Sequence, residues 1–264
     1  MKRIVLTIAM LAMVTSSVLA HDAWVETNTN LLRSGDSIYV DLKLGNHGND
    51  HRDFKQAGKV QIEKVKVEVV DPDGKKYDLT SNMVDQGYTP KEGYWTGKFS
   101  AFKPGVYTAA ATSDAIVNHG QAQRSLKSAK TFFHITESLD KPTPDDRVVG
   151  KVLGHAMELV PVVNPVLPMA AGKKFQVQLV MKGKPVANEK ISCIPQGHEL
   201  KEGFDAEYEF MTNEEGIISF TPKEGNRYLF VSHVVLNEKG DGYDATKYTA
   251  TLTLFVPDLC MCCE

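Results

Sequence analysis

The sequence lacks the features of a nucleic-acid-binding protein and of a membrane-spanning protein. Its 30 basic and 33 acidic residues give a formal net charge of -3, so there is no polybasic footprint for a phosphate backbone. After residue 20, no segment approaches the roughly 18 uninterrupted apolar residues that a membrane-spanning helix needs. We therefore expect no nucleic-acid partner and a chain that does not itself cross a membrane.

Recognisable catalytic motifs are missing as well. The sequence contains no Gly-x-Ser-x-Gly elbow, no phosphate-binding loop, no Gly-x-Gly-x-x-Gly and no His-Glu-x-x-His. The paired carboxylates Glu214 and Glu215 fall in a turn, where solvation explains them. We therefore predict that the protein is not an enzyme.

Cysteine is scarce and unevenly placed. Cys193 stands alone, and Cys260, Cys262 and Cys263 crowd the last five positions of the chain. A disulfide-stapled scaffold would spread its cysteines through the fold. Three interpretations of the tail remain open. Its sulfurs are soft ligands that favour copper(I) or zinc, its thiols can form disulfides between chains, or the tail is a frayed end without a role.

The beginning of the chain resembles a cleaved signal peptide. Lys2 and Arg3 form a basic start, Ile4 to Val14 are apolar, and Val18-Leu19-Ala20 reads as a small-residue cleavage site. We expect residues 1–20 to be removed and the protein to be periplasmic. His21 would then be the first residue, and its α-amine and imidazole together form a chelate for a divalent transition metal.

The remaining chain alternates apolar and polar residues with period two, and no helical period of useful length appears. Strands are expected at 23–27, 38–44, 65–69, 76–80, 94–99, 106–111 and 130–135. Seven short strands separated by turns predict an immunoglobulin-like β-sandwich over residues 21–140.

The Lys141-Pro142-Thr143-Pro144 stretch predicts a stiff linker over 141–150. A second β-sandwich is expected over 151–257, followed by a cysteine-rich tail over 258–264. The predicted fold class is all-β, with two tandem sandwiches.

The sandwich topology has a consequence for the histidines. If the seven strands reverse direction in turn, the start of the first lies at the same end as the loop carrying His47 and His51. The loop carrying His119 lies at that end too. We therefore predict a metal site formed by His21, His47, His51 and His119. His233 is expected at the end of a strand, within reach of an interdomain groove.

Several segments resemble a known family. The opening His21-Asp22-Ala23-Trp24-Val25-Glu26 is similar to that of periplasmic components attributed to cobalt and nickel uptake, the NikM-like and CbiK-like group. The stretches 154–161, 183–187 and 212–216 resemble its later segments. The resemblance implies a second domain like the transthyretin-like modules of carboxypeptidases and surface proteins. It also implies nickel or cobalt as the bound metal, with His21 as a ligand. The cysteine tail departs from the family pattern and admits copper or zinc.

These observations predict an exported metal-binding protein that serves nickel or cobalt uptake, with a membrane metal transporter as the further partner to consider. Two alternatives remain open. The first is a surface or adhesion scaffold of tandem sandwiches without a metal, because such modules are often structural. The second is a copper enzyme in which an N-terminal histidine and another histidine support oxidative chemistry on a polysaccharide.

Overall fold

The predicted all-β fold class is confirmed. The computed structural model describes residues 21–45, 62–87, 89, 92–118 and 120–260. Strands make up 53% of the described residues, and this part of the chain holds no α-helix. Its helical turns are the short 3-10 helices η2 (Ile62–Lys64), η3 (Thr80–Asn82) and η4 (Asp146–Val148). Within these residues no helix has the length and apolar character needed to cross a membrane.

Strands follow one another along the whole described chain. The first half contains β1 (Asp22–Thr27), β2 (Leu31–Arg33), β3 (Ser37–Gly45), β4 (Val65–Val70), β5 (Lys76–Asp78), β6 (Val84–Asp85), β7 (Trp95–Ser100), β8 (Gly105–Asn118) and β9 (Ala122–Thr136). The second half contains β10 (Met157–Pro161), β11 (Phe175–Met181), β12 (Lys184–Pro185), β13 (Lys190–Pro195), β14 (Glu209–Met211), β15 (Ile217–Phe220), β16 (Asn226–Leu236) and β17 (Ala245–Val256).

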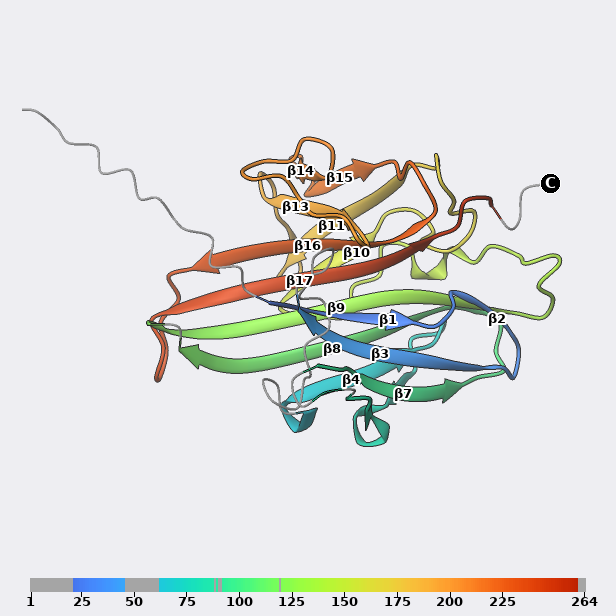
Figure 1. Cartoon of the computed structure of the whole chain (residues 1–264), viewed down its shortest axis with the longest axis horizontal. Coiled ribbons are helices and arrows are strands. Elements are labelled where there is room, and N and C mark those ends of the chain that lie inside the picture. Colours follow the sequence, from blue (N-terminus) through green and yellow to red (C-terminus); the bar gives the residue numbers. More distant parts are fainter. Residues whose placement is uncertain (1–20, 46–61, 88, 90–91, 119, 261–264) are drawn as a thin grey trace, which may run out of the picture.

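One nine-stranded sheet runs through the molecule (Figure 1). Its order is β14-β13-β16-β17-β9-β8-β4-β5, and β2 also pairs with β9. The two halves of the chain meet where β17 pairs in parallel with β9, from Ala245 opposite Gln123 to Thr253 opposite Thr131. A smaller sheet, β1-β3-β7-β6, contains strands of the first half, and another joins β10, β11, β12 and β15.

Alternating side chains of the nine-stranded sheet supply two different cores. In β9, Phe133 and Ile135 join the cluster that contains Val25 and Ile38 of β1 and β3. Phe132, on the other face, joins the cluster of β10, β11 and β17. Because successive strand residues point to opposite faces, one strand serves both cores. The nine-stranded sheet is therefore a layer that both sandwiches share, and we call it the middle layer.

The strands β8 and β9 are longer than the sequence predicts. The apolar alternation marks only 106–111 and 130–135, whereas the strands extend to Asn118 and begin at Ala122. The added residues are mostly half-buried or exposed, and they include the ion pair between Arg124 and Asp114. A hairpin extension that faces water has little hydrophobic pattern to reveal it. The short strands β2 and β6 are also additions to the predicted set.

A buried ion pair joins the middle layer to β10. Lys130 of β9 and Glu158 of β10 are each 2% exposed, and their side chains are in contact. The Glu158 carboxylate also accepts hydrogen bonds from the backbone N–H groups of Leu153, Gly154 and His155, at 2.9, 2.8 and 2.7 Å. Burial alone would raise the pKa of Glu158, but Lys130 and these donors outweigh it and lower the pKa. Burial lowers the pKa of Lys130, against the attraction of Glu158.

We expect Glu158→Gln to destabilise the protein strongly. The substitution preserves the size of the side chain but leaves the Lys130 charge buried without a counter-charge, a loss that costs about 3–5 kcal/mol in other proteins. Urea unfolding of the variant measures the free-energy difference. Lys223→Met, which breaks the exposed pair with Glu207, is the control and should change little. Equal small losses in the two variants would contradict the structural role of the buried pair.

A pH dependence follows from His155. Burial is the main cause that lowers the pKa of its imidazole to about 4. An unfolded histidine titrates near 6.5, so the unfolded chain binds a proton between these two values that folded His155 does not. Stability should therefore fall as the pH falls from about 6.5 to about 4, by up to about 3 kcal/mol from this group. The measured quantity is the unfolding free energy of the unchanged protein minus that of His155→Gln. This quantity should decrease by about the same amount as the pH is lowered across that range, because only the unchanged protein carries the buried imidazole. A difference that stays constant with pH would refute the assignment.

Candidate metal site at the start of the first strand

Strand β1 is fixed to the second half of the molecule by the side chains that it turns toward β16. Trp24 is 1% exposed and packs with Leu229 and Val231. The Glu26 carboxylate accepts a hydrogen bond of 2.6 Å from Arg227 of β16. Burial would raise the pKa of Glu26, but Lys43 and Arg227 lower it, so the carboxylate stays charged. The N-terminal strand is therefore held in place by an apolar contact and an ion pair.

The backbone at the beginning of β1 is held as well. Lys127 of β9 donates a hydrogen bond of 2.9 Å from Nζ to the carbonyl of His21. Thr251 of β17 donates one of 2.8 Å from Oγ1 to the carbonyl of Ala23. In β3, Gly45 lies opposite Asp22 in the antiparallel register. Two bonds to the middle layer and one neighbouring strand thus position residues 21–23.

His233 of β16 contacts this end of β1. Its Nε2 lies 2.6 Å from Oδ1 of Asp22. The contact follows from alternation in both strands, because Asp22, Trp24 and Glu26 face one way along β1. Along β16, His233, Val231, Leu229 and Arg227 share the face that meets them. The sequence places His233 at the end of a strand, but it contains no signal that pairs this strand with β1.

Asp22 acts electrostatically on two lysines, and a threonine lies beside His233 in the sheet. Burial lowers the pKa of Lys127 and of Lys247, and Asp22 partly offsets the effect on both. Thr249 lies between His233 and Lys127 in the register of the three strands. It is 1% exposed, and its Oγ1 has no hydrogen-bond partner within the described residues. The start of β1 and the adjacent residues of β9, β16 and β17 thus form a polar, charged and partly enclosed corner of the molecule.

Of the four predicted ligands, only His21 belongs to the described residues. His47 and His51 follow Gly45 in the chain and lie outside the described residues, as does His119. Asn118 and Ala122, on either side of His119, pair at the end of the β8–β9 hairpin. That pair stands five residues beyond Lys127, or about 17 Å along the strand. Participation of these three histidines in a metal site stays a prediction.

The two described cysteines, Cys193 and Cys260, lie away from this corner. Cys193 is fully buried, and burial raises the pKa of its thiol. Cys260 follows β17, which ends at Val256, seven residues beyond Thr249 and about 23 Å along the strand. Cys262 and Cys263 lie outside the described residues. Among the residues that the structure describes, no three His, Cys, Asp or Glu side chains form a group that could hold a metal ion.

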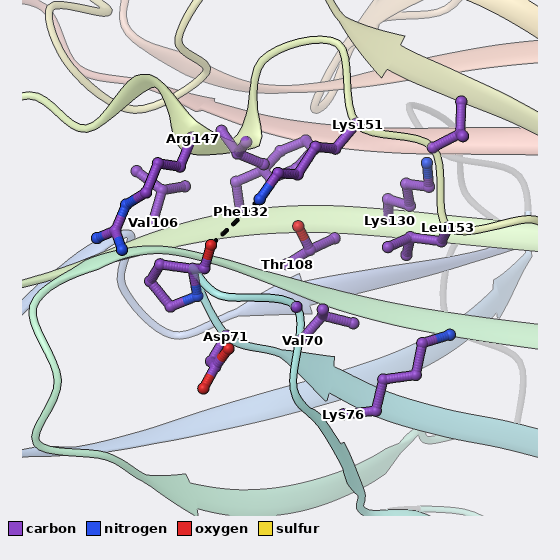
Figure 2. A pocket seen from close by; sticks show the side chains of 14 residues that line it. Val70, Asp71, Lys76, Val106, Thr108, Lys130, Phe132, Arg147, Lys151 and Leu153 are labelled. Atoms are coloured by element: carbon purple, nitrogen blue, oxygen red, sulfur yellow. Dashed lines mark hydrogen bonds between the residues drawn. The ribbon is translucent and has the colours of Figure 1, made fainter.

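Two cavities lie between the middle layer and the segment that leads to β10. The one in Figure 2 measures about 160 Å³, and its lining includes Lys76, Lys130, Arg147 and Lys151. Each of these cations already has a partner. Lys130 pairs with Glu158, and Lys76 pairs with Glu68. Arg147 pairs with Asp145 and Asp73, and Lys151 donates a hydrogen bond to the Pro72 carbonyl. The second, of about 500 Å³, is lined by Lys64, Lys66, Lys127, His155 and their neighbours. Within the described residues, neither cavity gathers a set of metal ligands.

Comparison with solved structures finds similar chains at low identity. The D0-D1 domain of intimin is 12% identical, with 88% of this chain and 97% of that chain covered and a TM-score of 0.24. Escherichia coli alpha-2-macroglobulin activated by porcine elastase is 14% identical over 90% of this chain and 20% of that chain, with a TM-score of 0.28. A bacterial ice-binding adhesin is 10% identical over 90% and 66%, with a TM-score of 0.25. The search of the curated proteins finds no match.

A family model covers most of the chain. Residues 18–235 match the model described as a domain of unknown function, DUF4198. The match begins just before His21 and extends past His233, so it includes both ends of the corner described above. The chain therefore belongs to the DUF4198 family.

Proposed function

We propose that this protein is an exported, periplasmic protein that binds a divalent transition metal and serves nickel or cobalt uptake as an accessory component. The observation that carries the proposal is the fixed position of His21. Its carbonyl is bonded to Lys127, and the next residue lies opposite Gly45. Removal of residues 1–20 would give this residue a free α-amine beside its imidazole, which is a bidentate nitrogen chelate.

The register of β1 and β3 supports participation of the following loop. His47 stands two residues after Gly45, and Gly45 is opposite Asp22. The chain thus leaves β3 beside the predicted new terminus. Asn118, the residue before His119, lies at the end of the sheet where β1 begins, because β1 runs in the direction of β9. His21 bonds to Lys127 of β9, and Ala23 bonds to Thr251 of β17, a strand parallel to β9.

The chemistry proposed here is capture and release rather than catalysis. Imidazole and amine nitrogens are ligands for nickel, cobalt, copper and zinc, and the order of affinities places copper above nickel and cobalt. The choice of metal therefore depends on the number of ligands and on which ion the exported protein meets. A membrane metal transporter is the receiving partner in this proposal.

Elemental analysis of the exported protein, made without an N-terminal tag, tests the proposal directly. We expect about one transition-metal ion per chain. His21→Ala should lower the affinity for Ni²⁺ by at least tenfold in a calorimetric titration, because it removes one arm of the chelate. One extra alanine in front of His21 should act similarly, since it converts the chelating amine into an amide. No stoichiometric metal, together with no thermal shift on addition of Ni²⁺, Co²⁺, Cu²⁺ or Zn²⁺, would favour the scaffold function instead.

Metal affinity should also depend on pH. The ligands bind only when they are deprotonated, so protons compete with the metal ion. We expect the affinity for Ni²⁺ to fall as the pH is lowered through the range in which free histidine titrates, near 6.5. Titrations at several pH values give the slope. An affinity independent of pH across this range would argue against imidazole ligands.

A further inference from the structure

The carbonyl of His21 is held by a charged group where a neutral one would serve. Lys127 donates to this carbonyl at 2.9 Å, whereas Thr251 donates from a hydroxyl to the carbonyl of Ala23 at 2.8 Å. The hydroxyl holds the strand without placing a charge in half-buried surroundings, which costs free energy. Lys127 therefore brings to the start of β1 a positive charge that its hydrogen bond does not require.

A second lysine adds to this charge. Lys247 lies opposite Ser125 in the parallel pairing of β17 with β9, two positions before Thr249, which lies opposite Lys127. Because alternate residues of a strand share a face, Lys247 and Lys127 lie on the same face of the middle layer. Both lysines are half-buried. The middle layer thus presents two ammonium groups to this corner.

The start of β1 is directed toward the second lysine. Strand β1 runs in the direction of β9, because His21 bonds to Lys127 and Ala23 bonds to Thr251, which lies opposite Ala129. Going back along β9 from Lys127, the next residue on the same face is Ser125, the partner of Lys247. The amine that cleavage before His21 would release therefore leaves the strand toward Lys247.

The acidic residues at this corner do not balance the lysines. Asp22 is the carboxylate that acts on both of them. It lies 2.6 Å from Nε2 of His233, and neither lysine is paired with a carboxylate among the residues that the structure describes. Two ammonium groups and one carboxylate leave a net positive charge. Such a corner repels a bare dication and attracts an anion.

The same residues leave coordination positions of the ion open. Within the described part of the chain, no three His, Cys, Asp or Glu side chains form a group that could hold a metal ion. The amine and imidazole of His21 would fill two positions, so the ion can keep ligands with which it arrived. We infer that the ion arrives as an anionic complex with a small polycarboxylate, whose carboxylates are attracted by Lys127 and Lys247. The inference rests on the proposed function, which supplies the bond from His21 to the ion.

The chemistry of the donors is consistent with a mixed complex. Divalent nickel and copper accept nitrogen and oxygen ligands together, so one ion can hold a carboxylate chelator and the His21 chelate at the same time. An ammonium group has three donors, and the His21 carbonyl uses one of those of Lys127. Citrate is a suitable probe, because it carries more negative charge than Ni²⁺ carries positive charge and its nickel complex is therefore an anion.

Calorimetric titrations of the exported, untagged protein compare Ni²⁺ in a non-coordinating buffer with preformed nickel citrate. Lys247→Gln removes a charge from the corner without touching the bond that holds His21, and Lys247→Arg keeps the charge. Asp22→Asn changes the charge in the opposite direction. Lys223→Gln is the matched control, because it removes an exposed charge that pairs with Glu207 in the second half of the chain. Unfolding midpoints of the metal-free variants show whether each one folds.

We expect Lys247→Gln to weaken the binding of nickel citrate and to strengthen the binding of Ni²⁺. Each change should be about threefold to tenfold, the effect of a unit charge several ångströms away in partly solvated surroundings. Asp22→Asn should have the opposite effect on each ligand, and it decides the matter if Lys247→Gln does not fold. Lys247→Arg and Lys223→Gln should bind like the unchanged protein. Added salt should weaken the binding of nickel citrate, because it screens the attraction.

Equilibrium dialysis with radiolabelled citrate shows whether the chelator stays with the ion. We expect the unchanged protein to retain about one citrate for each nickel. Nickel retained without citrate would overturn the inference, as would folded Lys247→Gln and Asp22→Asn that leave the ratio of the two affinities unchanged. In either case the proposed function stands if His21→Ala still loses Ni²⁺. If the unchanged protein binds neither form of nickel, the proposed function itself fails.

Discussion

The parallel pairing of β9 with β17 is the constraint on which the rest of the structure depends. It joins strands from the two halves of the chain into one sheet, so that each sandwich uses the same middle layer. The contacts at the candidate site come from both sides of this junction, because Lys127 lies in β9, Thr251 in β17 and His233 in β16. Loss of the pairing would separate His21 from His233 even if each half folded by itself. The candidate site is therefore a product of how the halves associate.

Local patterns in the sequence predict the individual strands well. The alternation of Ile38, Val40, Leu42 and Leu44 corresponds to β3, and that of Val65, Val67 and Val69 corresponds to β4. These residues bury one face of a strand, so burial leaves a visible period. The hairpin extension of β8 and β9 leaves no such period because water covers much of it. The boundaries of these two strands were accordingly too short in the prediction.

The pairing of distant strands is the part that the sequence could not supply. Nothing in the sequence of residues 123–131 identifies residues 245–253 as the strand that pairs with it. The hydrogen bonds between strands are made by backbone atoms, which are the same for almost every residue type. The approach of His233 to Asp22 follows from that pairing and from the packing of Trp24, so it was missed for the same reason. The choice of His21 as a candidate ligand rests on two local patterns, the signal-peptide-like start and the chemistry of an N-terminal histidine, and it stays a prediction.

If the start of the chain is cleaved as proposed, the anchoring of β1 separates assembly of the candidate site from its activation. Trp24, the Glu26–Arg227 pair and the bonds from Lys127 and Thr251 act on atoms that are the same whether or not residues 1–20 are attached. A chain with its leader would reach the same β-sheet arrangement but would present a peptide nitrogen, which is a poor ligand, where the processed chain presents an amine. Under the proposed function, the precursor would be folded yet unable to sequester metal inside the cell. The protein would become able to bind metal only after one peptide bond, that between residues 20 and 21, is cleaved on the far side of the membrane.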